Sequence, residues 1–277
     1  MKKILVPVDF SQHSEYALEV AAQLAKKYNA SIVALHMMGM SEAVLTRDDS
    51  NEVMEAMFYM KLAEKRFTEF LDKPYLKGIE IETTVQNFKV FKEMDRIAEE
   101  VNADLIVMGS HGSSGMKEVF VGSNTEKVVR TSNVPVLVIK NQAGTFSVDK
   151  MVFASDFSTE YFPAYEKARD VARLFESEFI LLYVNTPDGF RKTSDMEARA
   201  YQFLSGGGQE DLDRFPSVVY YNDNTIEDGI FSYSNRNQAD MIAIPTHGRR
   251  GLAHFFTGSI GEEVVNHSDI PVITFKI

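Results

Sequence analysis

One set of short motifs occurs twice in this sequence, in the same order, and this duplication constrains the fold more than any other feature. Residues 4–11 and residues 151–158 are both apolar runs that end in Asp-Phe-Ser. Three more pairs follow: residues 109–112 with 245–248, residues 122–123 with 258–259, and residues 133–137 with 269–273. Four ordered pairs indicate two homologous units, because a chance match would not recur so regularly.

The spacing between the copies shows where the two units differ. Three pairs are offset by 136 residues (112 to 248, 122 to 258 and 135 to 271), whereas the first pair is offset by 147 (9 to 156). The first unit is therefore longer by 147 − 136 = 11 residues, which we place around residues 38–59. Polar residues around Gly144 indicate a short linker within residues 141–149. We predict one domain at 1–143 and a second at 148–277.

The composition is that of an ordinary folded protein. Of the 277 residues, 44% are hydrophobic and 25% are charged, and each unit is long enough to bury its own core. The net charge of −11 argues against nucleic-acid binding, which needs a basic surface. The absence of Cys excludes disulfides and Cys-ligated metal. No apolar run approaches the roughly 18 residues of a membrane span, and we see no secretory signal pattern, so we expect a soluble cytoplasmic protein.

Hydrophobic patterns in the first unit predict strands that alternate with helices. Continuous apolar runs typical of buried strands cover residues 3–8, 31–38, 104–108 and 134–139. Residues 79–85 alternate Ile with Glu, which indicates a half-exposed strand at a sheet edge. Helices are predicted after an N-cap at Ser11 or Ser14 and over residues 52–71, 91–101 and 124–131. This alternation predicts a parallel sheet covered on both faces.

The loop that follows residues 104–108 has the features of an anion site. Gly109 and Gly112 allow the backbone to turn or to approach a ligand closely. Gly122 precedes a capping box from Ser123 to Glu126, and the amides of the helix that it opens favour an anion. Ligands of parallel α/β sheets bind at the carboxyl ends of strands, where Asp9 also lies. The alternative is that these glycines only shape turns, and both interpretations stay open.

Several other chemistries are not supported. The sequence has neither a Walker-type phosphate loop nor a G-x-G-x-x-G motif after a first strand, and residues 205–208 (Ser-Gly-Gly-Gly) are interpreted as a helix break or a flexible segment. His111 and His247 lack a nucleophile and an orienting partner, so no catalytic residue is assigned. His36 is interpreted as an interior histidine, and no metal-ligand spacing is present. The methionines of residues 54–60 fit helix packing, with an adaptable partner surface as the alternative.

Together these residues resemble the universal stress protein family, in its form with two fused units. The nucleotide-binding subgroup of that family has the motif G-x2-G-x9-G-[ST], which Gly109, Gly112, Gly122 and Ser123 match. The resemblance implies two tandem Rossmann-like units of the adenine nucleotide alpha hydrolase type, each an α/β, five-stranded parallel sheet of order 3-2-1-4-5 flanked by helices. It also implies pairing through the last strands, within the chain or in a homodimer.

The resemblance further implies which residues hold ATP or another adenine nucleotide. Asp9 would contact the ribose or adenine, and the backbone of Met37 would contact the adenine. The implied cofactor-binding residues are Pro7, Val8, Asp9, Met37, Met108, Gly109, His111, Gly112, Gly122, Ser123 and Asn124 in the first unit, and Asp156, Val184, Gly248, Gly258 and Ser259 in the second. Mg²⁺ would accompany a triphosphate, although no carboxylate cluster identifies its ligands.

The second unit departs from the family pattern. Pro245 replaces the first glycine and has no amide N–H to offer a ligand, while Arg249 and Arg250 are either phosphate ligands or surface charges. We therefore expect the first unit to bind nucleotide and the second to be weaker, altered or empty. The resulting hypothesis is an ATP-binding regulatory protein of the stress response that acts on an unnamed protein partner. The alternatives are an interaction module without nucleotide, and a hydrolase or nucleotidyl transferase, at most a slow ATPase.

Overall fold

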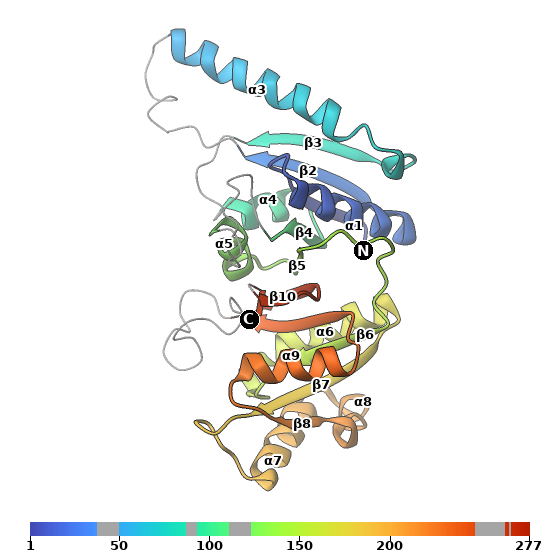
Figure 1. Ribbon diagram of the computed structural model, residues 1–277, viewed down its shortest axis with the longest axis vertical. Helices are drawn as coiled ribbons and strands as arrows, with labels where there is room; N and C mark the ends of the chain where they lie inside the picture. Colours follow the sequence, from blue (N-terminus) through green and yellow to red (C-terminus); the bar gives the residue numbers. More distant parts are fainter. Residues whose placement is uncertain (38–49, 87–92, 111–122, 247–263, 266) are drawn as a thin grey trace. The chain divides into compact units, whose positions relative to one another are not determined.

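The computed structural model describes residues 1–37, 50–86, 93–110, 123–246, 264–265 and 267–277. The chain divides into two compact units, Met1–Phe146 (unit 1) and Ser147–Ile277 (unit 2). Each unit is a parallel β-sheet with helices packed against it (Figure 1). The α/β architecture predicted from the sequence is confirmed.

The sheet of unit 1 is built around β1, which pairs in parallel with two strands. Its five strands are β1 (Lys3–Pro7), β2 (Ser31–Met37), β3 (Ile81–Gln86), β4 (Leu105–Gly109) and β5 (Val136–Ile139). They lie in the order β3-β2-β1-β4-β5. Leu5 of β1 is opposite Val33 of β2 on one side and Ile106 of β4 on the other. The winding of the chain therefore reverses between β1 and β4, which is where α/β sheets of this kind bind ligands.

The helices of unit 1 are α1 (Gln12–Tyr28), α3 (Ser50–Phe70), α4 (Met94–Glu100) and α5 (Ser123–Thr131), with a 3-10 turn at Pro74–Leu76. Ser11, not Ser14, is the N-cap of α1: its side chain accepts a hydrogen bond from the Ser14 N–H at 3.2 Å. Asn29 ends the helix in the left-handed conformation. Ala17, Leu18 and other buried residues of α1 pack on β1 and β4, so this helix covers the strands at the reversal point.

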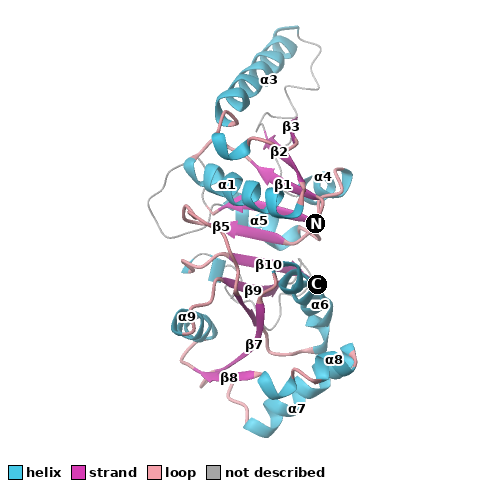
Figure 2. Ribbon diagram, turned by 90° about the vertical axis from the view of Figure 1, so that its right-hand side faces the viewer, coloured by secondary structure: helices cyan, strands magenta, loops and turns pink. Residues whose placement is uncertain are grey.

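Unit 2 repeats this plan. Its strands are β6 (Lys150–Ala154), β7 (Glu178–Asn185), β8 (Val219–Asn222), β9 (Met241–Thr246) and β10 (Val272–Lys276), in the order β10-β9-β6-β7-β8. Its helices are α6 (Phe162–Phe175), α7 (Thr193–Leu204), α8 (Gln209–Leu212) and α9 (Ile226–Arg236), with 3-10 turns at Thr159–Tyr161, Ser205–Gly207 and Phe215–Ser217. Figure 2 shows α6 and α9 on opposite sides of the strands of unit 2. The helix break predicted at residues 205–208 is confirmed, since a 3-10 turn there separates α7 from α8.

The extra length of unit 1 lies between β2 and β3. Leu35 is opposite Thr84, 84 − 35 = 49 residues later, whereas the equivalent Leu182 is opposite Val219, 219 − 182 = 37 residues later. This connection is therefore 49 − 37 = 12 residues longer in unit 1, one more than the net excess of 11. This connection contains the predicted residues 38–59, of which 38–49 lie outside the described part of the chain. Its helix α3 packs against the edge strand β3 (Figure 1).

The methionines of α3 do not pack as the sequence suggested. Ala63 and Phe67 are buried, but Met54, Met57 and Met60 are 68%, 53% and 44% exposed. The expectation of helix packing is therefore wrong for these three residues, and the buried residues among the described side chains of α3, Ala63 and Phe67, lie in its second half. Among the described residues, no helix is long and apolar enough to cross a membrane.

Candidate functional site

Three neighbouring strands of unit 1 end at the same edge of the sheet, and most of the predicted residues of this unit that are described lie there. Pro7 ends β1, Met37 ends β2, and Met108 and Gly109 end β4. The Val8 N–H continues the sheet by donating to the Leu35 carbonyl at 2.7 Å. The parallel pairing of β1 with both β2 and β4 brings these ends side by side.

Asp9 and Phe10 form a tight turn at this edge. The Asp9 Oδ1 atom accepts a hydrogen bond from the Ser11 N–H at 3.0 Å, and Phe10 has φ = 64°, which is uncommon for a residue with a side chain. The Phe10 ring packs on His36 and Phe67, with centroids at 4.6 and 5.2 Å. Phe10 was missed as a site residue, although the repeated Asp-Phe-Ser motif was the signal that could have found it.

His36 joins the end of β2 to this turn. Its Nδ1 atom lies 2.7 Å from the Val8 carbonyl oxygen, and its ring is partly buried against Phe10. The interpretation of His36 as a hydrogen-bonded interior histidine agrees with this geometry. The contact also fixes how far the turn lies from β2.

Close packing of β4 against α1 requires a glycine at position 109. A Cβ atom at this position would lie 2.6 Å from the His13 carbonyl oxygen, in the first turn of α1. The Gly109 carbonyl accepts a hydrogen bond from the buried Thr125 hydroxyl at 2.9 Å, which ties the first turn of α5 to the end of β4. Ser123 and Asn124 begin α5, so the N-terminal amides of that helix are held beside the strand end.

Six of the predicted binding residues are outside the part of the chain that the structure describes. His111, Gly112 and Gly122 of unit 1, and Gly248, Gly258 and Ser259 of unit 2, lie outside the described residues. The same holds for His247, Arg249 and Arg250. Among the residues that are described, no group of three or more His, Asp or Glu is arranged to hold a metal ion.

Unit 2 contains the same turn at the end of β6. The Asp156 Oδ1 atom accepts from the Ser158 N–H at 2.8 Å, and Phe157 has φ = 54°. The Phe157 ring packs on Tyr183 and Phe203, with centroids at 6.1 and 5.4 Å. Val184 lies in the neighbouring strand β7. The duplication seen in the sequence thus extends to the local geometry of the site.

Two features separate the second site from the first. Arg199 of α7 donates from Nε to the Asp156 carbonyl at 2.6 Å and from a terminal nitrogen to Asp156 Oδ2 at 2.5 Å. Pro245 lies within β9, where unit 1 has Gly109, and α6 begins only at Phe162 after a 3-10 turn. Arg199 was missed by sequence reasoning, because nothing in the sequence links it to an aspartate 43 residues away.

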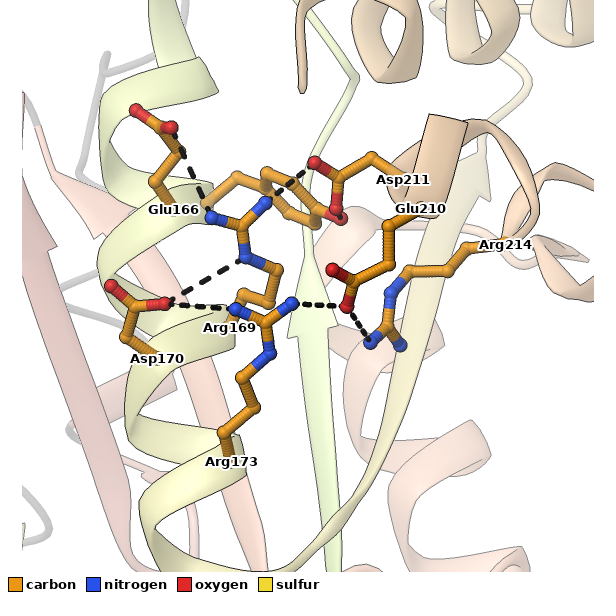
Figure 3. A network of polar contacts seen from close by, with 8 residues as sticks. Glu166, Arg169, Asp170, Arg173, Glu210, Asp211 and Arg214 are labelled. Atoms are coloured by element: carbon orange, nitrogen blue, oxygen red, sulfur yellow. Dashed lines mark hydrogen bonds and ion pairs between the residues drawn. The ribbon is translucent and has the colours of Figure 1, made fainter. Parts of the chain in front are cut away.

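A second cluster of charges in unit 2 serves packing. Asp211 of α8 is fully buried and accepts from the Tyr165 hydroxyl and from Arg169 of α6, each at 2.5 Å. Burial and the hydrogen bond to Asp211 raise the pKa of the Tyr165 hydroxyl. Surface charges surround this contact, as Figure 3 shows for Glu166, Asp170, Arg173, Glu210 and Arg214. Because these contacts join α6 to α8, the cluster fixes these two helices relative to each other.

Comparison with known proteins gives the same assignment for both units. The model of the universal stress protein family matches residues 1–140 and again residues 147–276. A universal stress protein of Methanocaldococcus jannaschii is 32% identical over 156 residues, which cover 51% of this chain and 96% of the relative. One of Bacillus subtilis is 33% identical over 147 residues, covering 50% of this chain and 98% of the relative.

Solved structures extend the likeness to the full length. A universal stress protein from Archaeoglobus fulgidus has a TM-score of 0.69 and 25% identity, covering 99% of this chain and 96% of the other. One from Pseudomonas aeruginosa has a TM-score of 0.65 at 17% identity, covering 100% and 93%, and so shows a shared fold. The chain belongs to the universal stress protein family, and it contains the family's unit twice.

Proposed function

We propose that this chain is an adenine nucleotide-binding regulatory protein of the stress response, with the competent site in unit 1. The domains that we assign are 1–143 and 148–277. The observation that carries the proposal is the meeting of Asp9, Gly109 and the first turn of α5 at the point where the winding reverses between β1 and β4. Sheets of this type bind ligands at that point.

The chemistry of this edge suits a nucleotide. The Asp9 carboxylate is an acceptor of the kind that ribose hydroxyls need, and Met37 ends the adjacent strand, where its backbone would meet the adenine. The amides at the start of α5 would face phosphate oxygens. Such binding relies on main-chain dipoles, so it is compatible with a net charge of −11. Pro7, Val8, Met108, Ser123 and Asn124 complete the described part of the proposed site.

The second site is proposed to be altered. Pro245 has no N–H at the position where Gly109 has one, and the carboxylate of Asp156 is already paired with Arg199. Val184, and Gly248, Gly258 and Ser259 beyond the described residues, keep the family pattern. Pro245 and the pairing of Asp156 with Arg199 favour a chain in which only unit 1 has a strong nucleotide site.

Regulation would follow if the nucleotide binds one arrangement of unit 1 more tightly than another. A nucleotide that contacts β1, β4 and α5 together stabilises one arrangement of these elements, and a protein partner could recognise that arrangement. We further propose a cytoplasmic location, pairing of the two units through their last strands or a homodimer, and Mg²⁺ with a triphosphate. Slow ATP hydrolysis remains the enzymatic alternative, without an assigned base.

Calorimetric titration of the full chain with ATP and Mg²⁺ tests the proposal. We expect one equivalent to bind, and we expect Asp9→Asn to weaken binding at least 10-fold, about 1.4 kcal/mol, since the amide keeps one oxygen but loses the charge. Glu80→Gln is the control for the loss of a carboxylate, because Glu80 is exposed and directly precedes β3, at the amino ends of the parallel strands, opposite the proposed site. A folded wild-type chain that binds none of ATP, ADP, AMP and cyclic AMP would contradict the proposal and leave the interaction module as the function.

A further inference from the structure

We propose that Arg199 decides which of the two duplicated sites takes a nucleotide, because its side chain occupies the ligand-binding groups of Asp156. The inference rests on the proposed function and adds to it the residue that closes the second site. It starts from two aspartates that are structurally equivalent. Asp9 and Asp156 each follow a central strand, and each Oδ1 accepts the N–H two residues later.

Arg199 binds Asp156 through two hydrogen bonds. Its Nε–H donates to the main-chain carbonyl of Asp156 and a terminal N–H donates to Oδ2, so both remaining acceptors face one guanidinium. The Asp156 side chain is only 11% exposed and that of Arg199 only 28%. Hydrogen bonds between charged groups are roughly twice as strong as neutral ones. A ribose hydroxyl that approaches Asp156 must therefore displace a better donor.

Unit 1 has a methyl group at the matching position. In both units an aromatic residue of the β2–β3 or β7–β8 connection packs on the Phe of the Asp-Phe-Ser turn, namely Phe67 and Phe203. Their offset, 203 − 67 = 136, is the offset found for the later motif pairs. The same offset pairs Arg199 with Ala63 (199 − 63 = 136), which is 3% exposed and has no side-chain donor. The two sites thus differ by an alanine and an arginine at one helix position.

The arginine and the alanine have different consequences for the aspartates of the two units. In unit 2 the arginine joins α7 to the end of β6 and gives the Asp156 carboxylate a charged partner without a ligand. In unit 1 the corresponding α3 position is the uncharged Ala63, and the guanidinium of Arg66 on the same helix lies over the Phe10 ring, 5.5 Å from its centroid. The structure therefore assigns to Arg199 the contacts with Asp156 that a ligand would otherwise make. Removing the Arg199 side chain should expose the second site.

The test is the stoichiometry of ATP binding to the full chain in equilibrium dialysis with Mg²⁺. Wild type should bind about one equivalent, and Arg199→Ala should bind about two, the second more weakly because Pro245 is unchanged. Adding Asp156→Asn to Arg199→Ala should remove the gained site. Arg236→Ala is the matched control, since Arg236 is an exposed arginine at the end of α9.

The converse variant moves the arginine into unit 1. Ala63→Arg should weaken ATP binding at least 10-fold, and Ala63→Met, of similar length without the charge, should weaken it less. Circular dichroism of each variant establishes that the chain is folded, and if Ala63→Arg fails to fold, the Arg199→Ala titration decides alone.

Each outcome of the titration is informative. The inference is overturned if folded Arg199→Ala gains no second site. It is also overturned if wild type binds two equivalents, or if the single equivalent that it binds depends on Asp156. If wild type binds nothing, the proposed function of unit 1 fails, yet a site gained in Arg199→Ala would still support the inference, and its absence would overturn it.

Discussion

Two adjacent glycines of unit 2 differ sharply in the space around them. A Cβ atom at Gly207 would lie 1.9 Å from Asp211 Oδ2 and 2.9 Å from the Phe162 ring, whereas one at Gly206 would lie 3.5 Å from that ring, an ordinary contact. The Oδ2 atom in question is the one that binds Arg169 at 2.5 Å. At the scale of single residues, the packing of a buried carboxylate therefore explains Gly207, and a φ of 88° explains Gly208.

We predict opposite effects for the two alanine substitutions. Gly207→Ala should destabilise the protein by roughly 1–3 kcal/mol, because the methyl group displaces the Asp211 carboxylate from Arg169. Gly206→Ala should be neutral or stabilise by about 0.4–1 kcal/mol, since alanine narrows the unfolded ensemble. Urea unfolding of both variants measures the difference, and equal effects would contradict the packing explanation.

Helix α3 has two halves with different environments, and this division matters at the scale of elements. Phe67, near its end, is 3% exposed and packs on Phe10, whereas Phe58, near its middle, is 63% exposed. Both are phenylalanines of one helix, so their helix propensities are equal. Their contributions to stability should differ only through burial.

We predict that Phe67→Ala lowers the free energy of unfolding by about 3–5 kcal/mol, the usual cost of a large cavity in a core. Phe58→Ala should stay within about 0.5 kcal/mol of wild type, as exposed substitutions do. Chemical denaturation followed by circular dichroism measures both. A comparable loss in Phe58→Ala would mean that this part of α3 is covered in solution.

At this scale the sequence predicted much of the structure. The apolar runs became β1, β2, β4 and β5, and the Ile-Glu alternation became the edge strand β3. Periodicity did not predict which side of α3 is buried, because Met54 and Phe58 are apolar on one face while Ala63 and Phe67 are apolar on the other. Only the position of the helix at the sheet edge decides between the two faces.

The whole molecule consists of two units that each bury their own core. Ile106 in β4 and Ile242 in β9 are equivalent by the 136-residue offset, and both are fully buried. A ligand of one unit stabilises that unit alone, unless the units unfold together. The stability of the two units, one with ligand and one without, can therefore be compared in a single sample.

Scanning calorimetry of the full chain should show one transition that ATP shifts and one that it does not. At 100 times its dissociation constant, ATP should stabilise unit 1 by about 2.7 kcal/mol. Ile106→Val should lower the transition that responds to ATP, and Ile242→Val the other, each by about 0.5–1.5 kcal/mol. If ATP shifts the transition that Ile242→Val lowers, the competent site is in unit 2.

The candidate site was predictable only as far as local signals reach. The duplicated motifs identified Asp9 and Asp156 and the strand ends that carry them. The difference between those aspartates comes from Arg199, which belongs to another element and reaches Asp156 only after the chain has folded. Contacts between distant elements depend on the path of the intervening chain, and no local pattern records them.

The placement of the extra residues of unit 1 has a practical consequence. They enter between β2 and β3, and β3 is the strand of unit 1 farthest from β4 in the strand order. Lengthening a connection costs little, about 0.6 kcal/mol for each doubling. This connection, already longer than its counterpart in unit 2, is where a fluorescent reporter or epitope tag could be spliced into the chain without altering the sheet.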